Sequence, residues 1–169
     1  CMGDVTRRTL QEASDLRSCE FLTVGTHRRD LLGKQPSEPG RERVCLVLAE
    51  GEHLEGIELF GFALKAARQL PDHRFIFRTH PILPFHRISR QVLGTKSLPT
   101  NVEISKNHSL AEDIDRAGWT LYRGSSTVIN TVLGGLKAFY PIRDGELSID
   151  PLFSLDHWRE YVSDVGELV

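Results

Sequence analysis

The stretch WTLYRGSSTVINTVLGG, residues 119–135, places a short apolar run before a polar turn and an apolar segment of helical period. The run at residues 119–123 is typical of a buried strand. The turn at residues 124–127 then predicts a strand-to-helix elbow, where free backbone N–H groups can hold an anion. One face of the predicted helix is formed by Val128, Ile129, Val132, Leu133 and Leu136.

The same alternation of strand and helix recurs on both sides of the elbow. Apolar runs predict further strands at residues 44–49, 74–78, 101–105 and 137–141. Helical periods and caps predict helices at residues 55–70, 84–93, 109–118, 126–135 and 154–165. Ser109 is the expected N-cap and Gly118 the expected C-terminal stop of one helix. This alternation predicts an α/β fold, a doubly wound parallel sheet of the Rossmann-like kind.

The first residues of the chain do not continue this alternation. They predict a helix at 7–18, a short strand at 20–25 and a charged, loop-forming linker at 34–43. We therefore divide the chain into an N-terminal segment with an interdomain linker, residues 1–43, and a Rossmann-like domain, residues 44–169. The opening CMGDVTRRTL is unlike a natural start and indicates either a fragment of a longer protein or added residues.

Composition excludes several classes of protein. The 169 residues are enough for one domain, and 40% of them are hydrophobic. The net charge of −2 argues against non-specific binding of nucleic acid. The three cysteines form no Cys-x-x-Cys pair, and Cys45 within VCLVLA is most simply a buried thiol. No membrane span or signal peptide is predicted, so we expect a soluble protein in the reducing cytoplasm, which leaves peripheral membrane association open.

Side chains capable of chemistry follow the first four strands of the predicted sheet. Because ligands bind at the carboxyl edge of parallel sheets, we expect these residues to gather at one edge. In chain order they are Glu50, Gly51 and Glu52; His80; Ser105, Lys106 and Asn107; and Gly124, Ser125, Ser126 and Thr127.

His80 and the elbow are complementary halves of a phosphate site. Pro81 restricts His80 to an extended conformation, so the imidazole is expected to project at the sheet edge. A histidine beside a phosphate becomes a cation that donates a hydrogen bond or a proton. The elbow would offer its hydroxyl groups and first-turn amides to the same phosphate, and Gly124 lets the backbone approach closely. Taken singly, a turn histidine and a serine N-cap are ordinary structural features.

The acidic loop after the first strand offers a general base. Glu50 or Glu52 could take the proton of an acceptor hydroxyl group, and the sequence leaves open which of them does so. Carboxylates at a helix start also simply favour its dipole. The sequence has no Walker-type cradle, no G-x-G-x-x-G and no metal-ligand spacing of histidines, so we expect neither a metal nor a cofactor.

The order of these motifs resembles the C-terminal, donor-binding domain of two-domain GT-B glycosyltransferases. The matches are Glu50-Gly51, His80-Pro81 and Ser125-Ser126, and they look most similar to bacterial sialyltransferases, polysialyltransferases and capsule polysaccharide enzymes. The resemblance covers roughly residues 21–151. It implies that residues 44–169 bind a nucleotide sugar, and that a partner domain for the acceptor is missing from this chain.

The resemblance also implies residue roles and a reaction. Glu50 would be the base, with Glu52 its competitor, because Ala49 stands where the family has its first acid. His80 would contact the donor phosphate and assist departure of the nucleotide, and Ser125 and Ser126 would hold that phosphate. Ser105, Lys106 and Asn107 would lie near the nucleotide base. The reaction implied is a metal-independent displacement at the anomeric carbon, with a CMP-activated sugar favoured because one phosphate needs less neutralisation than two.

Two other functions are also compatible with this sequence. Polyol-phosphate transferases that use CDP-glycerol have similar His-Pro and Ser-Ser signals on the same fold. A non-catalytic Rossmann-like module that binds a nucleotide or a protein would also fit. A UDP-sugar donor is disfavoured, because Asn130 stands where many such enzymes place a ribose-binding glutamate.

Overall fold

The computed structural model describes residues 3–13, 15, 19–25, 40–106, 109–143 and 145–168, in two compact units, Cys1–Leu32 and Gly33–Val169. In the first unit, helix α1 spans Asp4–Ala13 and buries none of its side chains. It begins earlier than the predicted residue 7, with Asp4 favouring the positive end of the helix dipole. Residues 20–25 are not a strand, contrary to the prediction, because no partner strand pairs with them in the described part of this unit.

The second unit is built on a six-stranded sheet in the order β3-β2-β1-β4-β5-β6, in which every neighbouring pair is parallel. The predicted α/β fold class is confirmed. The strands are β1 Val44–Leu48, β2 Arg74–Arg78, β3 Val102–Ile104, β4 Trp119–Tyr122, β5 Lys137–Pro141 and β6 Glu160–Val162.

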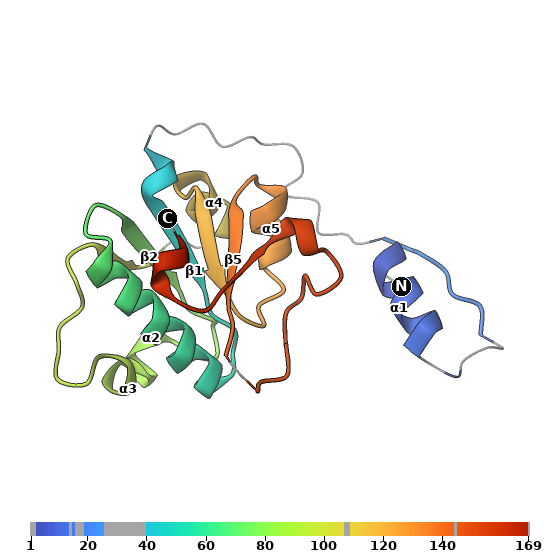
Figure 1. The fold of residues 1–169 in the computed structure, drawn as a ribbon, viewed down its shortest axis with the longest axis horizontal. Helices are drawn as coiled ribbons and strands as arrows, with labels where there is room; N and C mark the ends of the chain where they lie inside the picture. The colour runs from blue at the N-terminus through green and yellow to red at the C-terminus, as the bar shows by residue number, and fades with distance from the viewer. Residues whose placement is uncertain are drawn as a thin grey trace. The chain divides into compact units, whose positions relative to one another are not determined.

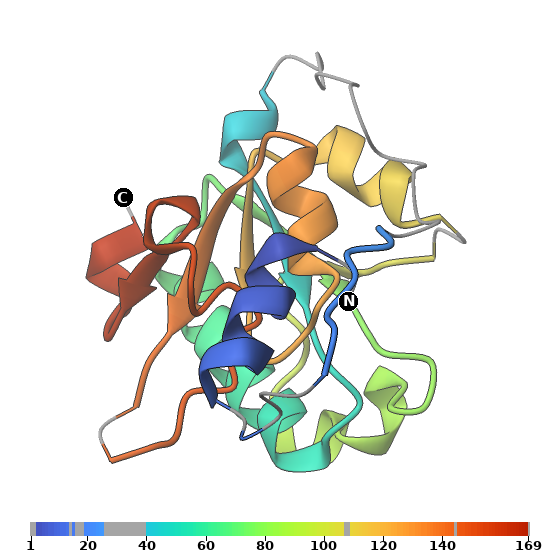
Figure 2. The same cartoon turned by 90° about the vertical axis from the view of Figure 1, so that its right-hand side faces the viewer.

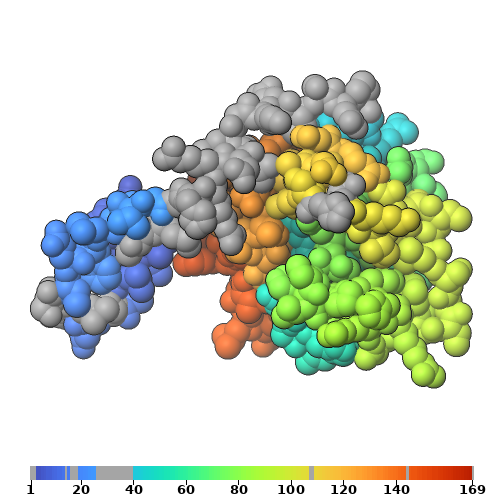
Figure 3. All heavy atoms as spheres, turned by 180° about the vertical axis from the view of Figure 1, so that it is seen from behind, coloured from blue at the N-terminus to red at the C-terminus, as the bar shows by residue number. Residues whose placement is uncertain are grey.

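Helices cover both faces of this sheet (Figures 1 and 2). Helix α2, His53–Gln69, packs on β1, β2 and β4 on one face, together with α3, Ser89–Leu93, and the short helix η4, Val165–Leu168. Helices α4, Leu110–Arg116, and α5, Val128–Leu133, pack on the other face. Their yellow and orange atoms are visible from behind in Figure 3. The remaining short helices are η1 Arg41–Arg43, η2 Phe85–Arg87 and η3 Asp156–Trp158.

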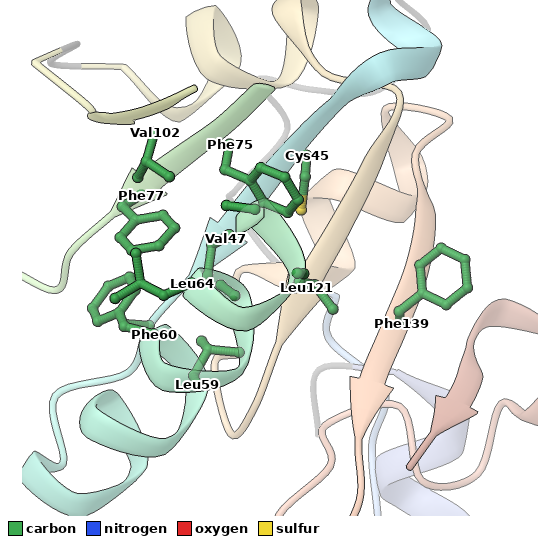
Figure 4. Packing of buried hydrophobic residues seen from close by; sticks show 14 of the residues in the cluster. Cys45, Val47, Leu59, Phe60, Leu64, Phe75, Phe77, Val102, Leu121 and Phe139 are labelled. Carbon is green, nitrogen blue, oxygen red and sulfur yellow. The ribbon is translucent and has the colours of Figure 1, made fainter. Parts of the chain in front are cut away.

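The main core lies between the sheet and α2. Alternate strand residues such as Cys45, Phe77 and Leu121 point toward Phe60 and Leu64 of α2 (Figure 4). The rings of Phe60 and Phe77 stack with centroids 4.7 Å apart, which adds a specific contact to the burial of both side chains. Because helices cover both faces of the sheet, its strands are buried on both sides, which explains why their sequences are apolar on both faces.

The C-terminal helix predicted at residues 154–165 does not exist. This segment forms η3, strand β6 and the start of η4 instead. The unpaired edge of β5 offers backbone hydrogen bonds, and Tyr161 and Val162 pair with Tyr140 and Pro141 there. Tertiary pairing has overridden a helical sequence period, and the sheet gains its sixth strand.

Two other predicted helices differ in detail from the structure. The segment 84–93 is split into η2 and α3 at Ile88. Helix α5 is shorter than predicted, and Ile129 and Leu133 of its expected apolar face are 39% and 41% exposed. Across the residues described, no helix combines the length and the apolar character needed to span a membrane.

Candidate functional site

The candidate site lies at the carboxyl edge of β1 and β4. These strands are adjacent, but the helix that follows β1 packs on one face and the helix that follows β4 packs on the other. Such a switch point is where open α/β sheets bind ligands. The acidic loop after β1, the His80 turn after β2 and the elbow after β4 all meet here.

Glu50 and the elbow are in direct contact. A methyl group added at Gly124 would lie 2.2 Å from Glu50 Oε2, so the Glu50 carboxylate rests against the glycine backbone. Gly124 has a φ of 58°, a conformation that glycine adopts without strain. Glu52 points elsewhere, because its carboxylate caps α2 by accepting the Glu55 N–H at 2.7 Å.

His80 faces the same loop. A methyl group at Gly51 would lie 3.0 Å from His80 Nδ1, so the two turns pack closely. The Ile82 N–H donates to that Nδ1 at 3.3 Å, which places the hydrogen of a neutral ring on Nε2. His80 can therefore present an N–H donor on the side of the ring that faces away from its own turn.

The elbow is a tight turn with a limited set of free donors. The Ser125 N–H donates to the Arg123 carbonyl at 2.5 Å, and the Val128 N–H donates to the Ser125 carbonyl. Ser125 is nearly buried, and its Oγ lies 2.7 Å from Thr127 Oγ1. In the described part of the chain, the amides of Gly124, Ser126 and Thr127 donate to no protein group, so they are available to an anion. Ser126 is exposed.

The structure describes two of the three predicted base-binding residues, Ser105 and Lys106. Ser105 Oγ donates to the buried carboxylate of Asp113 at 2.7 Å, and Arg78 contacts the same carboxylate at 2.6 Å. Ser105 is thus held by an internal polar cluster. Lys106 is exposed, and Asn107 lies outside the described residues.

Sequence reasoning missed Arg123, the residue directly before the elbow. Its side chain is 2% exposed, and its guanidinium binds Glu55 at 2.5 Å, the Pro141 carbonyl at 2.6 Å and Glu146. A hollow of about 90 Å³ lies beside it, lined in part by Tyr140, Arg143 and Tyr161. The sequence did contain a signal for this residue: Arg123 is a charged residue at the end of an apolar strand. A charge buried there requires a partner, so its position alone pointed to an ion pair.

The two neighbouring acids have opposite pKa shifts. Burial raises the pKa of the Glu50 carboxyl, the charges of Glu55 and Glu52 raise it further, and Arg123 and His80 only partly oppose them. Hydrogen bonds from backbone N–H groups, first that of Glu55, lower the pKa of Glu52. Glu50 is therefore the acid whose environment favours proton uptake, which a general base requires.

These shifts predict opposite effects on stability. A raised folded-state pKa means that ionisation of Glu50 opposes folding, so this penalty is present at neutral pH and disappears as pH falls below the ordinary pKa. We expect Glu50→Gln to unfold at higher urea concentration than the parent at pH 7, with the difference vanishing near about pH 4. Urea denaturation at both pH values measures this.

Glu52→Gln is the matched control, because Glu52 lies two positions after Glu50 in the same loop. Its lowered pKa means that the ionised cap stabilises the fold above the ordinary pKa and that this contribution is lost as pH falls. Glu52→Gln should therefore be less stable than the parent at pH 7. Equal shifts of the same sign in both variants would contradict this assignment of the two acids.

A metal site is not formed by the described residues. Among them, no group of three histidine, cysteine, aspartate or glutamate side chains is arranged to hold a metal ion. The donors at the site are instead the Nε2–H of His80 and the amides of the elbow, which suit an oxyanion.

Comparisons with known proteins show that the fold of this chain is similar to that of solved structures. No family model matches this chain, and no curated protein matches it. Solved structures do match. One is the pneumococcal O-GlcNAc transferase GtfA in complex with UDP and GlcNAc, at 13% identity and a TM-score of 0.55, covering 86% of this chain and 29% of that one. Another is the glycotransferase of kitacinnamycin, at 17% identity and a TM-score of 0.51, covering 86% and 36%.

A third structure with this fold has a different kind of name. It is described as a UDP-N-acetylglucosamine 2-epimerase from Listeria monocytogenes, with 12% identity and a TM-score of 0.52, covering 82% of this chain and 39% of that one. The chain thus spans about a third of the length of the solved chains that it resembles. At these identities the likeness concerns the fold alone, the Rossmann-like α/β fold of the parallel sheet.

Proposed function

We propose that this chain is the donor-binding domain of a glycosyltransferase that uses a CMP-activated sugar to build a surface polysaccharide. The observation that carries the proposal is the meeting of the Glu50 carboxylate, the His80 turn and the Gly124 elbow at the switch point of the sheet. A base, a proton donor and a phosphate cradle are the parts that metal-free sugar transfer needs. The acceptor domain would be supplied by chain that is not in this sequence.

The proposed reaction is a single displacement. The acceptor hydroxyl oxygen attacks the anomeric carbon, the bond from that carbon to the phosphate oxygen breaks, and CMP leaves. Glu50 takes the proton of the acceptor. His80 donates a hydrogen bond from Nε2 to the departing phosphate. The elbow holds that phosphate through the hydroxyl group of the exposed Ser126 and the amides of Gly124, Ser126 and Thr127.

A singly phosphorylated nucleotide suits the charge of this site. Glu50 lies on the elbow itself, so a bound phosphate and an ionised Glu50 would repel each other. Repulsion grows with each phosphate charge, which supports CMP over a nucleoside diphosphate. Because the pKa of Glu50 is raised, nucleotide binding should tighten as pH falls through that raised pKa and Glu50 takes up a proton.

The proposal is tested by titrating CMP, CDP and UDP calorimetrically into the chain. We expect CMP to bind most tightly, and His80→Ala or Ser125→Ala/Ser126→Ala to weaken it about tenfold or more, the value of one charge-assisted hydrogen bond. The exposed His86, in η2 of the same connection, gives the control His86→Ala, which should bind as the parent does.

Three outcomes would contradict the proposal. Binding that His80→Ala and the double serine variant leave unchanged would remove the phosphate from this edge of the sheet. Tighter binding of UDP would replace the cytidine donor with a uridine donor, and tighter binding of CDP would favour polyol-phosphate transfer.

A further inference from the structure

The guanidinium of Arg123 joins three separate segments at the candidate site. Nε and Nη2 donate to Glu55, in the first turn of α2, at 2.5 and 3.4 Å. Nη1 donates to the carbonyl of Pro141, at the end of β5, at 2.6 Å. Nη2 also contacts Glu146, in the loop that follows β5. Through its own backbone carbonyl, Arg123 closes the turn that positions Ser125.

We propose that Arg123 is the positioning residue of the phosphate elbow, which it fixes against the first turn of α2 and the loop after β5. The role in donor binding rests on the proposed function. The role in ordering the elbow does not, and it can be measured without any nucleotide.

Arginine is suited to this position in a way that lysine is not. A guanidinium has donors that point in several fixed directions, so one side chain can bind Glu55, Pro141 and Glu146 at once. An ammonium group is a point charge and would satisfy these partners poorly. The side chain also lies over the Tyr140 ring, 5.3 Å from its centroid, which limits its movement.

The same cation acts on Glu50. The charged groups that face the Glu50 carboxylate are Glu55 and Glu52 of the α2 start, Arg123 of the elbow and His80 of the β2 turn. Arg123 is the buried cation among these groups, and its positive charge offsets part of the repulsion that Glu55 and Glu52 exert on the Glu50 carboxylate. A displaced cation should raise the pKa of Glu50, a signature that a loss of packing alone would not give.

The test compares Arg123→Lys with Arg159→Lys. Arg159 is a matched control, because its side chain is also buried, at 3% exposed, and also paired with a carboxylate, that of Asp150, but it precedes β6. Hydrogen–deuterium exchange of the elbow amides, residues 125–130, should be about tenfold faster in Arg123→Lys and unchanged in Arg159→Lys. The titration midpoint of the Glu50 carboxyl carbon by NMR should move upward only in Arg123→Lys.

A second variant covers the case in which Arg123→Lys does not fold. Glu55→Gln lies outside the elbow and removes the negative charge and one of the two acceptor oxygens that the guanidinium binds, so it should also speed exchange at residues 125–130. Elbow amides that exchange at the parental rate in either folded variant would overturn the positioning role.

If the parent binds no nucleotide, the proposed function fails, while the exchange result still decides the role of Arg123. If CMP binds, its Kd should rise about tenfold in Arg123→Lys and stay unchanged in Arg159→Lys.

Discussion

Asp150→Ala is expected to destabilise the protein by about 3–5 kcal/mol, because it leaves a buried arginine without its buried partner. The Asp150 carboxylate accepts hydrogen bonds from the Tyr122 hydroxyl and the Leu152 N–H, at 2.7 and 2.8 Å, and from Arg159 Nε. The cluster links β4 to the segment around β6. Burial and the bond to Asp150 raise the pKa of Tyr122, so its hydroxyl remains a donor. Thermal unfolding should show a Tm lowered by roughly 10 °C.

The control for this variant is Asp156→Ala. Asp156 also contacts Arg159, at 3.1 Å, but its side chain is 89% exposed. An exposed ion pair contributes about 0.2–1 kcal/mol, so this variant should unfold close to the parent. Similar losses in the two variants would mean that burial of the Asp150 pair is not what stabilises the C-terminal segment.

Gly118→Ala is expected to cost about 3 kcal/mol, because the added methyl group would meet backbone atoms that cannot move aside. It would lie 2.5 Å from the Arg41 carbonyl oxygen and 2.8 Å from Glu42 Cα. Gly118 also donates its N–H to the Val44 carbonyl at 3.0 Å, so its backbone is fixed at the start of β4. The midpoint of urea unfolding measures the loss.

Gly61→Ala should have the opposite sign. Gly61 lies within α2, and a methyl group added there meets nothing within 4 Å. Alanine is favoured over glycine in a helix interior by about 0.5–1 kcal/mol, so this variant should be more stable than the parent. A Gly118→Ala protein as stable as the parent would show that the η1 backbone yields, contrary to expectation.

Gly118 illustrates what local sequence could not reveal. Its position after a helical period predicts a helix stop, but the C-cap of α4 is Ala117 and Gly118 has no positive φ. A glycine is needed because a distant segment, η1, passes over it. The same limit applies to residues 154–165, where the free edge of β5 turned a helical period into strand β6.

The candidate site was predicted in its parts. The acidic loop, the His80 turn and the elbow each follow a strand, and the sheet brings the first and last of these into contact at Glu50 and Gly124. The choice between Glu50 and Glu52 was open in the sequence. In the structure the Glu52 carboxylate caps α2, which supports Glu50 as the proposed base. The catalytic roles of these residues stay predictions.

The sequence by itself determined the fold class and the edge at which polar side chains gather. Strand and helix periods are local properties, and parallel strands necessarily end at one edge. The tertiary structure alone decided the sixth strand, the pairing of Arg123 with Glu55 and Glu146, and the direction of the Glu50 pKa shift. Each of these depends on groups far apart in the chain, because burial and Coulomb interactions are set by distance in space.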